Sequence, residues 1–225
     1  MGEIHIDLFA TLDMVGQSPG DPDEDPEGFP FGGWQAPLFD ATIGEAVTSG
    51  MVGMDALVLG RTTYDIFAAH WPHQDDGVDG SIARLFNSIP KYVASRGTPQ
   101  LDWAGSRRLG EDLVAEIQDL RTKHERIHVI GSLDLVQTLL RERAYDRLNL
   151  WVFPLTLGVG KKVFARGTVP ANLELLEPPV VSTTGAVLLR YGLADSVPDT
   201  GDMRRADRGL SGSQAEEGPE QGGAT

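Results

Sequence analysis

The 225-residue sequence contains no cysteine and no long apolar run. The lack of cysteine excludes disulfides, thiolate metal sites and cysteine nucleophiles, and it fits a cytoplasmic protein. The longest apolar runs, such as the one over 148–157, have about half the length that a transmembrane helix needs. The N-terminus reads MGEIHID, with acidic residues and no apolar stretch. We therefore expect neither a signal peptide nor a membrane partner.

Basic residues are scarce as well, because 19 Lys and Arg stand against 33 Asp and Glu, for a net charge of −14. Nucleic acids and anionic membranes bind basic faces, so we expect neither as a partner. The acids gather in two stretches: 18–33 holds five acids and no base, and the tail from 195 holds seven acids against three arginines. The remainder is only mildly acidic, and its apolar residues suffice for the core of one domain.

The end of the chain differs in composition from the rest. From about Val197 the apolar residues disappear, and the chain ends LSGSQAEEGPEQGGAT. Such a segment cannot bury enough apolar surface to offset the entropy of ordering. We therefore predict one domain over 1–196 and a disordered acidic tail over 197–225.

A long stretch rich in Pro, Gly and Asp, SPGDPDEDPEGFPFGG, follows a first strand predicted over 3–12. A loop of this length inside a domain is typically a lid, a binding loop or disordered. Phe29, Phe31 and Trp34 lie at its end, and aromatic side chains gain little by staying in water. This favours a lid.

Strands and helices alternate along the rest of the chain. Apolar runs predict strands over 56–60, 90–96, 126–132 and 146–157, helices over 37–50, 61–71, 111–123 and 133–142, and a terminal hairpin over 173–193. Such alternation indicates an α/β fold with a mostly parallel sheet flanked by helices on both faces. The terminal hairpin adds an antiparallel part at one edge.

Polar residues follow three of these strands: Gly60-Arg61-Thr62-Thr63, Ser95-Arg96 and Gly131-Ser132. Ligands of such sheets bind beyond the carboxyl ends of the strands, and a helix N-terminus attracts anions. Two arginines near one nucleotide point to NADPH rather than NADH. A threonine N-cap beside a solvated Arg61 is the alternative at the first turn. The first strand lacks a following G-x-G-x-x-G, which argues against an ordinary Rossmann dehydrogenase.

Four stretches, in the order LVLGRTTYDIF, PKYVASR, VIGSLDLVQTLL and DRLNLWVFPLTLGVGKKVF, resemble the dihydrofolate-reductase-like superfamily. They are more similar to the branch related to the reductase domain of the riboflavin-biosynthesis deaminase-reductase. The resemblance covers roughly 3–193. It implies a dihydrofolate-reductase-like central sheet of eight strands, NADPH as hydride donor, and a small heteroaromatic or sugar-imine substrate.

The resemblance also implies which residues hold the cofactor. The Arg61 turn would meet the 2′-phosphate and pyrophosphate, the Ser95 turn the adenosine end, and the Gly131 turn the diphosphate, with the nicotinamide against the first strand. The predicted cofactor contacts are Ala10, Val15, Gly60, Arg61, Thr62, Thr63, Ser95, Arg96, Ile130, Gly131, Ser132 and Leu133.

On the substrate side the sequence departs from both relatives. Pro90 stands where folate reductases usually have Arg, and Trp151 where they usually have Thr. Asp40 lies near the position of their buried carboxylate, which helps to protonate the ring, so it is the predicted catalytic acid; the alternative is a solvated helical acid. The predicted substrate contacts are Asp13, Trp34, Asp40 and Trp151.

These observations predict an NADPH-dependent reductase acting on a small pterin-, pyrimidine- or ribosylamino-type substrate. The alternative is a non-catalytic nucleotide- or ligand-binding protein on the same fold. Relatives in the riboflavin branch often pair through sheet edges and C-terminal strands, and the hairpin over 173–193 supplies an apolar edge, so the resemblance implies a homodimer. Pro72 separates His70 from His73, so these two do not share a helix face and we expect no metal site.

Overall fold

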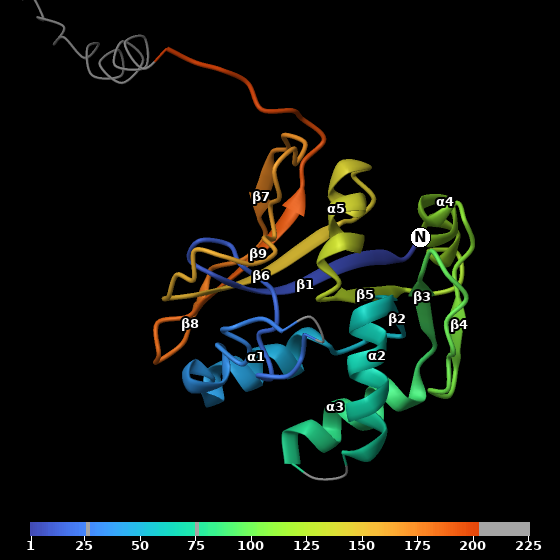
Figure 1. The fold of residues 1–225 in the computed structure, drawn as a ribbon. Coiled ribbons are helices and arrows are strands. Elements are labelled where there is room, and N and C mark those ends of the chain that lie inside the picture. Colours follow the sequence, from blue (N-terminus) through green and yellow to red (C-terminus); the bar gives the residue numbers. More distant parts are fainter. Residues whose placement is uncertain (26–27, 75–76, 203–225) are drawn as a thin grey trace, which may run out of the picture.

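The computed structural model describes residues 1–25, 28–74 and 77–202, which form one sheet with helices on both faces (Figure 1). The strands are β1 (Glu3–Thr11), β2 (Ala56–Gly60), β3 (Lys91–Ala94), β4 (Ser106–Arg108), β5 (Arg126–Ile130), β6 (Arg147–Phe153), β7 (Leu173–Leu175), β8 (Val180–Val181) and β9 (Val187–Leu193). The helices are α1 (Ala41–Gly50), α2 (Arg61–His70), α3 (Gly77–Ser88), α4 (Leu113–Leu120) and α5 (Leu133–Arg141), with short 3₁₀ turns at Ala36–Leu38 and Trp71–His73.

The strand order is β4-β3-β2-β5-β1-β6-β9-β7, with β8 also paired to β9. Strands β1 to β6 run parallel to one another, whereas β9 is antiparallel to β6, β7 and β8. This confirms the predicted mostly parallel sheet with an antiparallel C-terminal part. The part of the chain that the structure describes has nine strands rather than eight, and the first strand of the predicted hairpin is divided into two short ones, β7 and β8.

The apolar run of β2 shows why the sheet needs helices on both faces. Neighbouring side chains of a strand point to opposite faces. Ala56 and Val58 therefore pack into the core beneath α4 and α5, while Leu57 and Leu59 pack against α2 and α3. All four side chains are fully buried. Figure 1 shows α5 on one face of the sheet and α1, α2 and α3 on the other.

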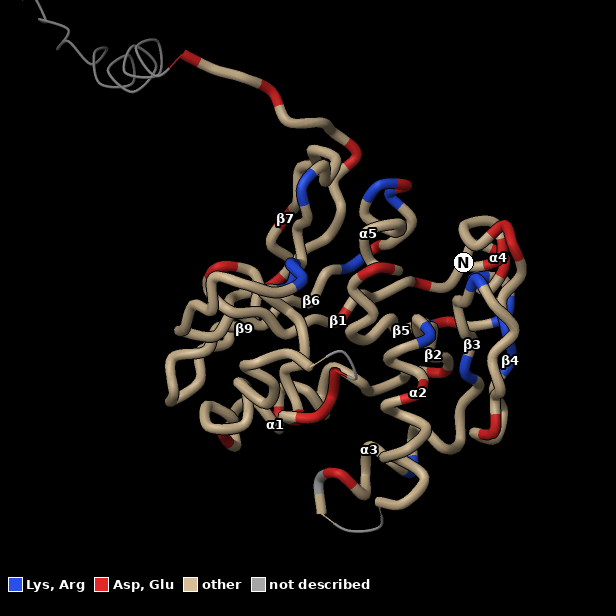
Figure 2. The backbone as a smooth tube through the Cα atoms, in the orientation of Figure 1, with Lys and Arg blue, Asp and Glu red and all other residues tan. Residues whose placement is uncertain are grey.

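The sequence patterns do not predict α3 and β4. Helix α3 contains two glycines, at 77 and 80, which weaken a helical pattern. Strand β4 consists of Ser106, Arg107 and Arg108, without any apolar residue. It lies at the edge of the sheet, where charged side chains discourage pairing with another chain, and Figure 2 shows basic residues along it.

The loop after β1 is anchored in the core at its end. Phe29 and Trp34 are buried, whereas Phe31 is exposed. The Trp34 ring meets Phe153 edge-on at 5.5 Å, and its Nε1 donates to the Gln17 carbonyl at 2.8 Å. The acidic part of this loop lies beside α1 (Figure 2). Two of the three aromatic residues are thus withdrawn from water, as the lid prediction assumes.

The C-terminal strands leave apolar side chains exposed at the other edge. Leu175, Leu176 and Val181 are each exposed. This is the edge predicted to form a homodimer, and the pairing stays a prediction. Residues 198–202 have no helix or strand, and 203–225 lie outside the described residues, so the disorder of the tail also stays a prediction. Among the described helices, none combines the length and apolarity that crossing a membrane requires.

Candidate functional site

A cleft of about 1140 Å³ opens where β2, β3 and β5 end. Two sets of residues line most of it. What we call the turn half comes from the turns after β2, β3 and β5 and from the end of β4: Gly60, Arg61, Thr62, Thr63, Ser95, Arg96, Gly97, Arg108, Ile130, Gly131, Ser132 and Leu133. What we call the floor half comes from β1, β6, β9 and the loops after β1 and β6: Asp7, Phe9, Gly16, Gln17, Ser18, Glu24, Asp25, Asn149, Trp151, Lys161, Leu188 and Arg190.

Side-chain hydroxyls join the turns after β2 and β5. The Gly60 backbone N–H donates to Ser132 Oγ at 2.8 Å, and the Ser132 N–H donates to Thr63 Oγ1 at 3.1 Å. Gly131 has φ 59°, a conformation that favours glycine, and a Cβ on it would lie 3.6 Å from Thr63. The two predicted motifs therefore form one rigid unit.

The helix N-termini in this unit differ from those elsewhere. Helices α1 and α4 are capped by carboxylates, since Asp40 accepts from the Ile43 N–H at 2.9 Å and Asp112 from the Ala115 N–H at 3.1 Å. Helices α2 and α5 begin after Gly60 and Ser132, and neither has a side-chain cap. Their first N–H groups lack helical partners and carry the positive end of the dipole. The alternative of a threonine N-cap on α2 is wrong, because Gly60 occupies the cap position.

Three arginines surround the uncapped N-termini. Arg61 forms an i,i+4 ion pair with Asp65 at 2.6 Å, and its side chain is 43% exposed. Arg96 is exposed, and Arg108 Nε donates to the Ser95 carbonyl at 3.2 Å. Arg108 was not predicted, because β4 shows no strand pattern in the sequence. The turn half therefore offers backbone donors and guanidinium groups, as a multiply charged anion requires.

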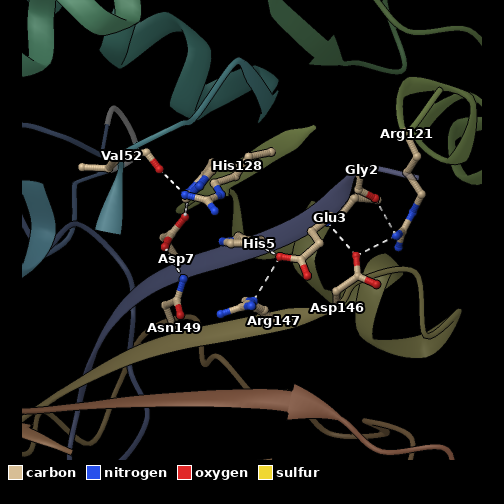
Figure 3. A network of polar contacts seen from close by, with 12 residues as sticks. Gly2, Glu3, His5, Asp7, Val52, Arg121, His128, Asp146, Arg147 and Asn149 are labelled. Carbon is tan, nitrogen blue, oxygen red and sulfur yellow. Dashed lines mark hydrogen bonds and ion pairs between the residues drawn. The ribbon is translucent and has the colours of Figure 1, made fainter. Parts of the chain in front are cut away.

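The floor half is built on cross-strand neighbours. Asp7 of β1 lies opposite Asn149 of β6, and Asn149 lies opposite Arg190 of β9. Asn149 Nδ2 donates to Asp7 Oδ1 at 2.8 Å, and Asp7 Oδ2 lies 2.6 Å from Nδ1 of His128 on β5 (Figure 3). His128 is 1% exposed, whereas the Asp7 side chain is 27% exposed. Asp7 thus faces the cleft while its partners hold it in place.

Asp7 is held as a carboxylate. Burial by itself would raise the pKa of Asp7, but the charge interaction with His128 and the hydrogen bonds from His128 and Asn149 outweigh it, so the net shift is downward. An ionised carboxylate can only accept hydrogen bonds. Sequence reasoning missed Asp7, although polar His5 and Asp7 alternate with apolar Ile4 and Ile6 in β1, which is a usable signal.

Behind Asp7 the polar network continues along β1 (Figure 3). The His5 and His128 rings lie 4.7 Å apart, and His5 Nε2 lies 3.0 Å from the Glu3 carboxylate. Arg147 Nε donates to the same carboxylate at 3.2 Å. Burial lowers the pKa of His5, against the opposing effect of Glu3. These contacts place a row of charged and polar groups beneath the cleft floor.

Asp40 lies outside the cleft lining. One of its oxygens caps α1, and the other accepts from the Thr183 N–H at 2.8 Å and from Thr183 Oγ1 at 2.6 Å. The hydrogen bond from Thr183 lowers the pKa of Asp40. Asp40 thus caps α1, and its predicted roles as catalytic acid and substrate contact stay predictions.

The other residues predicted as contacts on the first strand and its loop also lie outside the cleft lining. Ala10 and Val15 are fully buried in the core. Asp13 accepts from Thr11 Oγ1, which lowers its pKa to about 2, and from two N–H groups of the loop after β6. Asp13, Ala10, Val15 and Trp34 do not line the cleft, and Gly16 to Ser18 do so instead.

The residues predicted at the three turns do line the cleft. The structure brings ten of the predicted cofactor residues to the cleft: Gly60, Arg61, Thr62, Thr63, Ser95, Arg96, Ile130, Gly131, Ser132 and Leu133. Of the predicted substrate contacts, Trp151 lines the cleft. Whether these residues bind a cofactor and a substrate stays a prediction.

The chain belongs to the RibD C-terminal domain family, whose model matches residues 44–185. A curated relative, the uncharacterized protein YyaP of Bacillus subtilis (strain 168), is 24% identical over 140 residues, which are 61% of this chain and 73% of the relative. Its name assigns no activity. Family membership therefore supports a reductase-type function without naming a substrate.

Solved structures share the fold. A protein from Shewanella sp. PV-4 named for riboflavin biosynthesis matches with a TM-score of 0.61 at 19% identity, over 85% of this chain and 99% of that one. A pyrimidine reductase-like protein from Corynebacterium diphtheriae matches at 0.56 and 14%, over 87% and 93%. Dihydrofolate reductase from Enterococcus faecalis, complexed with NADP(H) and RAB-propyl, matches at 0.52 and 16%, over 86% and 98%. These likenesses confirm the dihydrofolate-reductase-like fold.

Proposed function

We propose that this chain is an NADPH-dependent reductase that transfers a hydride to a small pterin-, pyrimidine- or ribosylamino-type substrate. The observation that carries the proposal is the turn half, where two uncapped helix N-termini are hydrogen-bonded together through Ser132. Carboxylates cap α1 and α4, and neither of these two caps, Asp40 and Asp112, lines the cleft. Membership of a reductase-related family supports the same conclusion.

The residues of the turn half fit a nicotinamide dinucleotide phosphate. Gly131 lets the backbone approach a ligand closely, and the N-terminus of α5 would hold the pyrophosphate. Arg61 and Arg96 would hold the 2′-phosphate, since guanidinium groups match the geometry of phosphate. NADH lacks this phosphate, so the arginines would make the difference between the two cofactors.

The chain's own contribution to the reaction is binding and orientation. When bound, the nicotinamide supplies the hydride. Phe9, Trp151 and Leu188 form an apolar row of cross-strand neighbours on the floor half, which excludes water beside the Asp7 row. Holding two reactants in a fixed geometry lowers the barrier, because the entropy of bringing them together is lost on binding.

Replacing Arg61 with alanine tests the proposal. The loss of charge-assisted contacts should weaken NADPH binding by roughly 1.5–3 kcal/mol, or roughly ten- to a hundredfold in dissociation constant. NADH binding should change little. Both cofactors are titrated by fluorescence against the wild type and against Arg141→Ala, which removes an exposed arginine at the far end of α5. Equal losses for NADPH and NADH, or none, would reduce the Arg61 turn to a structural role.

A non-catalytic nucleotide- or ligand-binding protein is the second candidate. It is favoured by the position of Asp40, which caps α1 and leaves the cleft without the acid expected of folate reductases. NADPH oxidation, followed by absorbance with a panel of pterins, pyrimidines and flavins, distinguishes the two. Tight NADPH binding without oxidation by any of the panel would favour the second candidate.

A further inference from the structure

We infer that Asp7 is the residue through which the cleft recognises its substrate, by accepting hydrogen bonds from N–H groups of a neutral or cationic nitrogen heterocycle. This inference rests on the proposed function, because it names the chemistry of the molecule that the floor half would bind. It is carried by the contacts of Asp7 and by the charges around it.

The Asp7 carboxylate has acceptor capacity to spare. An ionised carboxylate offers about four lone-pair sites on its two oxygens. Asn149 uses one site on Oδ1 and His128 one on Oδ2. Asp7 lines the cleft with 27% of its side chain exposed. The unused sites can therefore take N–H donors of a ligand, two of them side by side.

The partners of Asp7 fix its position and its role as acceptor. His128 is 1% exposed, and its Nε2 has no hydrogen-bond partner within the described part of the chain. The contact of 2.6 Å between His128 Nδ1 and Asp7 Oδ2 holds the carboxylate in place. The His5 ring lies 4.7 Å from the same ring, tilted by 46°, and Glu3 and Arg147 pair with each other beyond it. His128 and Asn149 are positioning residues.

The charges of the floor half favour a ligand without a negative group. Besides Asp7, the loop after β1 contributes Glu24 and Asp25 to the lining. The two basic residues of the floor half both have acidic partners. Arg190, whose side chain is 15% exposed, pairs with Glu177 at 3.0 Å, and Lys161 pairs with Asp134 at 3.5 Å. A phosphorylated or carboxylated ring would meet carboxylates here, whereas ring and exocyclic N–H groups would meet acceptors.

The test compares two probes of similar size, 2,4-diaminopyrimidine, which presents N–H donors, and 2,4-dimethoxypyrimidine, which presents none. Binding is measured by calorimetry with the full chain. The wild type should bind the diamino probe at least tenfold more tightly, and Asp7→Asn should lose that preference. An Asn side chain at position 7 has one acceptor oxygen and one N–H₂ group. Its N–H₂ group would face either His128 or Asn149, so the side chain could not accept hydrogen bonds from the ligand as Asp7 does. Glu45→Gln, which neutralises an exposed carboxylate on α1 outside the cleft lining, should retain it.

Two further measurements keep the outcome clear. If Asp7→Asn melts and binds NADPH like the wild type yet still prefers the diamino probe, the inference is overturned. Should Asp7→Asn fail to fold, Asp7→Ser serves, because it removes the carboxylate without adding an N–H₂ group and should lose the preference. A preference retained by Asp7→Ser would overturn the inference. NADPH titration of each sample reports on the proposed function separately, so either idea can fail alone.

Discussion

The two halves of the cleft differ in how their polar groups are supplied. In the turn half the donors are backbone N–H groups at the starts of α2 and α5, assisted by arginines that reach the cleft from the ends of strands. In the floor half the acceptor is a side chain in the middle of β1, held by Asn149 and His128 from two neighbouring strands. The turn half is suited to anions and the floor half to N–H donors.

If the proposed function holds, this division would let one cleft bind an anionic cofactor and an N–H-rich substrate, each in its own half. An anion in the floor half would meet Asp7, Glu24 and Asp25, whereas an N–H-rich ring in the turn half would meet arginines and backbone N–H groups. Selectivity of this kind comes from repulsion at the wrong site as well as from attraction at the right one. Changes confined to one half should therefore leave the other half's binding intact.

The largest difference between the effects on the two halves is expected from Gly131→Val. The glycine has φ 59°, which a β-branched residue adopts at a cost of about 1–3 kcal/mol. Relief of that strain should move the backbone away from the geometry that holds Thr63 and Ser132, and NADPH affinity should fall by roughly ten- to a hundredfold. The Gly131 N–H donates to the Asp7 carbonyl at 3.2 Å, so the affinity for 2,4-diaminopyrimidine should fall as well, but by less than the NADPH affinity.

Gly167→Val is the matched control, measured by the same two titrations and by thermal melting. Gly167 also has positive φ, 91°, but no atom lies within 4 Å of a Cβ built on it, and it does not line the cleft. Both variants should lose stability, while NADPH binding should fall only in Gly131→Val. An equal loss of NADPH affinity in both would mean that the effect is one of general destabilisation.

The difference between the halves also explains what the sequence could predict. The turn half consists of contiguous motifs at the ends of strands, so the residues around Arg61, Ser95 and Gly131 could be named from local patterns. Asp7 meets His128 and Asn149 only through strand pairing across more than 100 residues, which no local pattern encodes. The edge strand β4 is short and polar, and Arg108 was missed with it.

The two acids that the sequence proposed for the substrate side show a second limit. An aspartate just before a helix can be either a cap or a functional acid, and Asp40 proves to be the cap of α1. Asp13, close after β1, ties its turn to the loop after β6 rather than facing the cleft. Spacing in the sequence does not distinguish these roles, because each depends on which distant N–H groups lie nearby.

A smaller effect, on stability and not on binding, is expected from Asp13→Asn. The pKa of Asp13 is lowered from 3.8 to about 2, chiefly by the Thr11 hydroxyl and by N–H groups of Gly158 and Leu157. The unfolded chain therefore binds the proton more readily, and the stabilisation by this carboxylate is present above about pH 4 and lost as the pH falls toward 2.

Thermal melting as a function of pH checks this prediction. The wild type should melt higher than Asp13→Asn at neutral pH, and the two curves should converge as the pH is lowered through that window. NADPH binding at neutral pH should be the same in both, since Asp13 does not line the cleft. A difference in melting that persists unchanged at pH 2 would show that the amide disturbs the turn by its shape and not by its charge.

The smallest effect is expected from ending the chain after Val197. The cut keeps the hydrogen bonds that Asn172 donates to Ser196 Oγ and to the Val197 carbonyl, at 2.8 and 3.0 Å. The cut removes three more acidic than basic residues. This net negative charge could repel anionic NADPH from the turn half only by long-range electrostatics. At physiological ionic strength charges are screened beyond about 8 Å. We therefore expect the melting temperature, NADPH affinity and diaminopyrimidine affinity all to match the full chain at 0.15 M salt, and NADPH to bind slightly tighter to the truncated chain at low salt. A marked loss of stability would mean that the tail packs on the domain, and a loss of NADPH affinity alone would place part of the tail at the turn half.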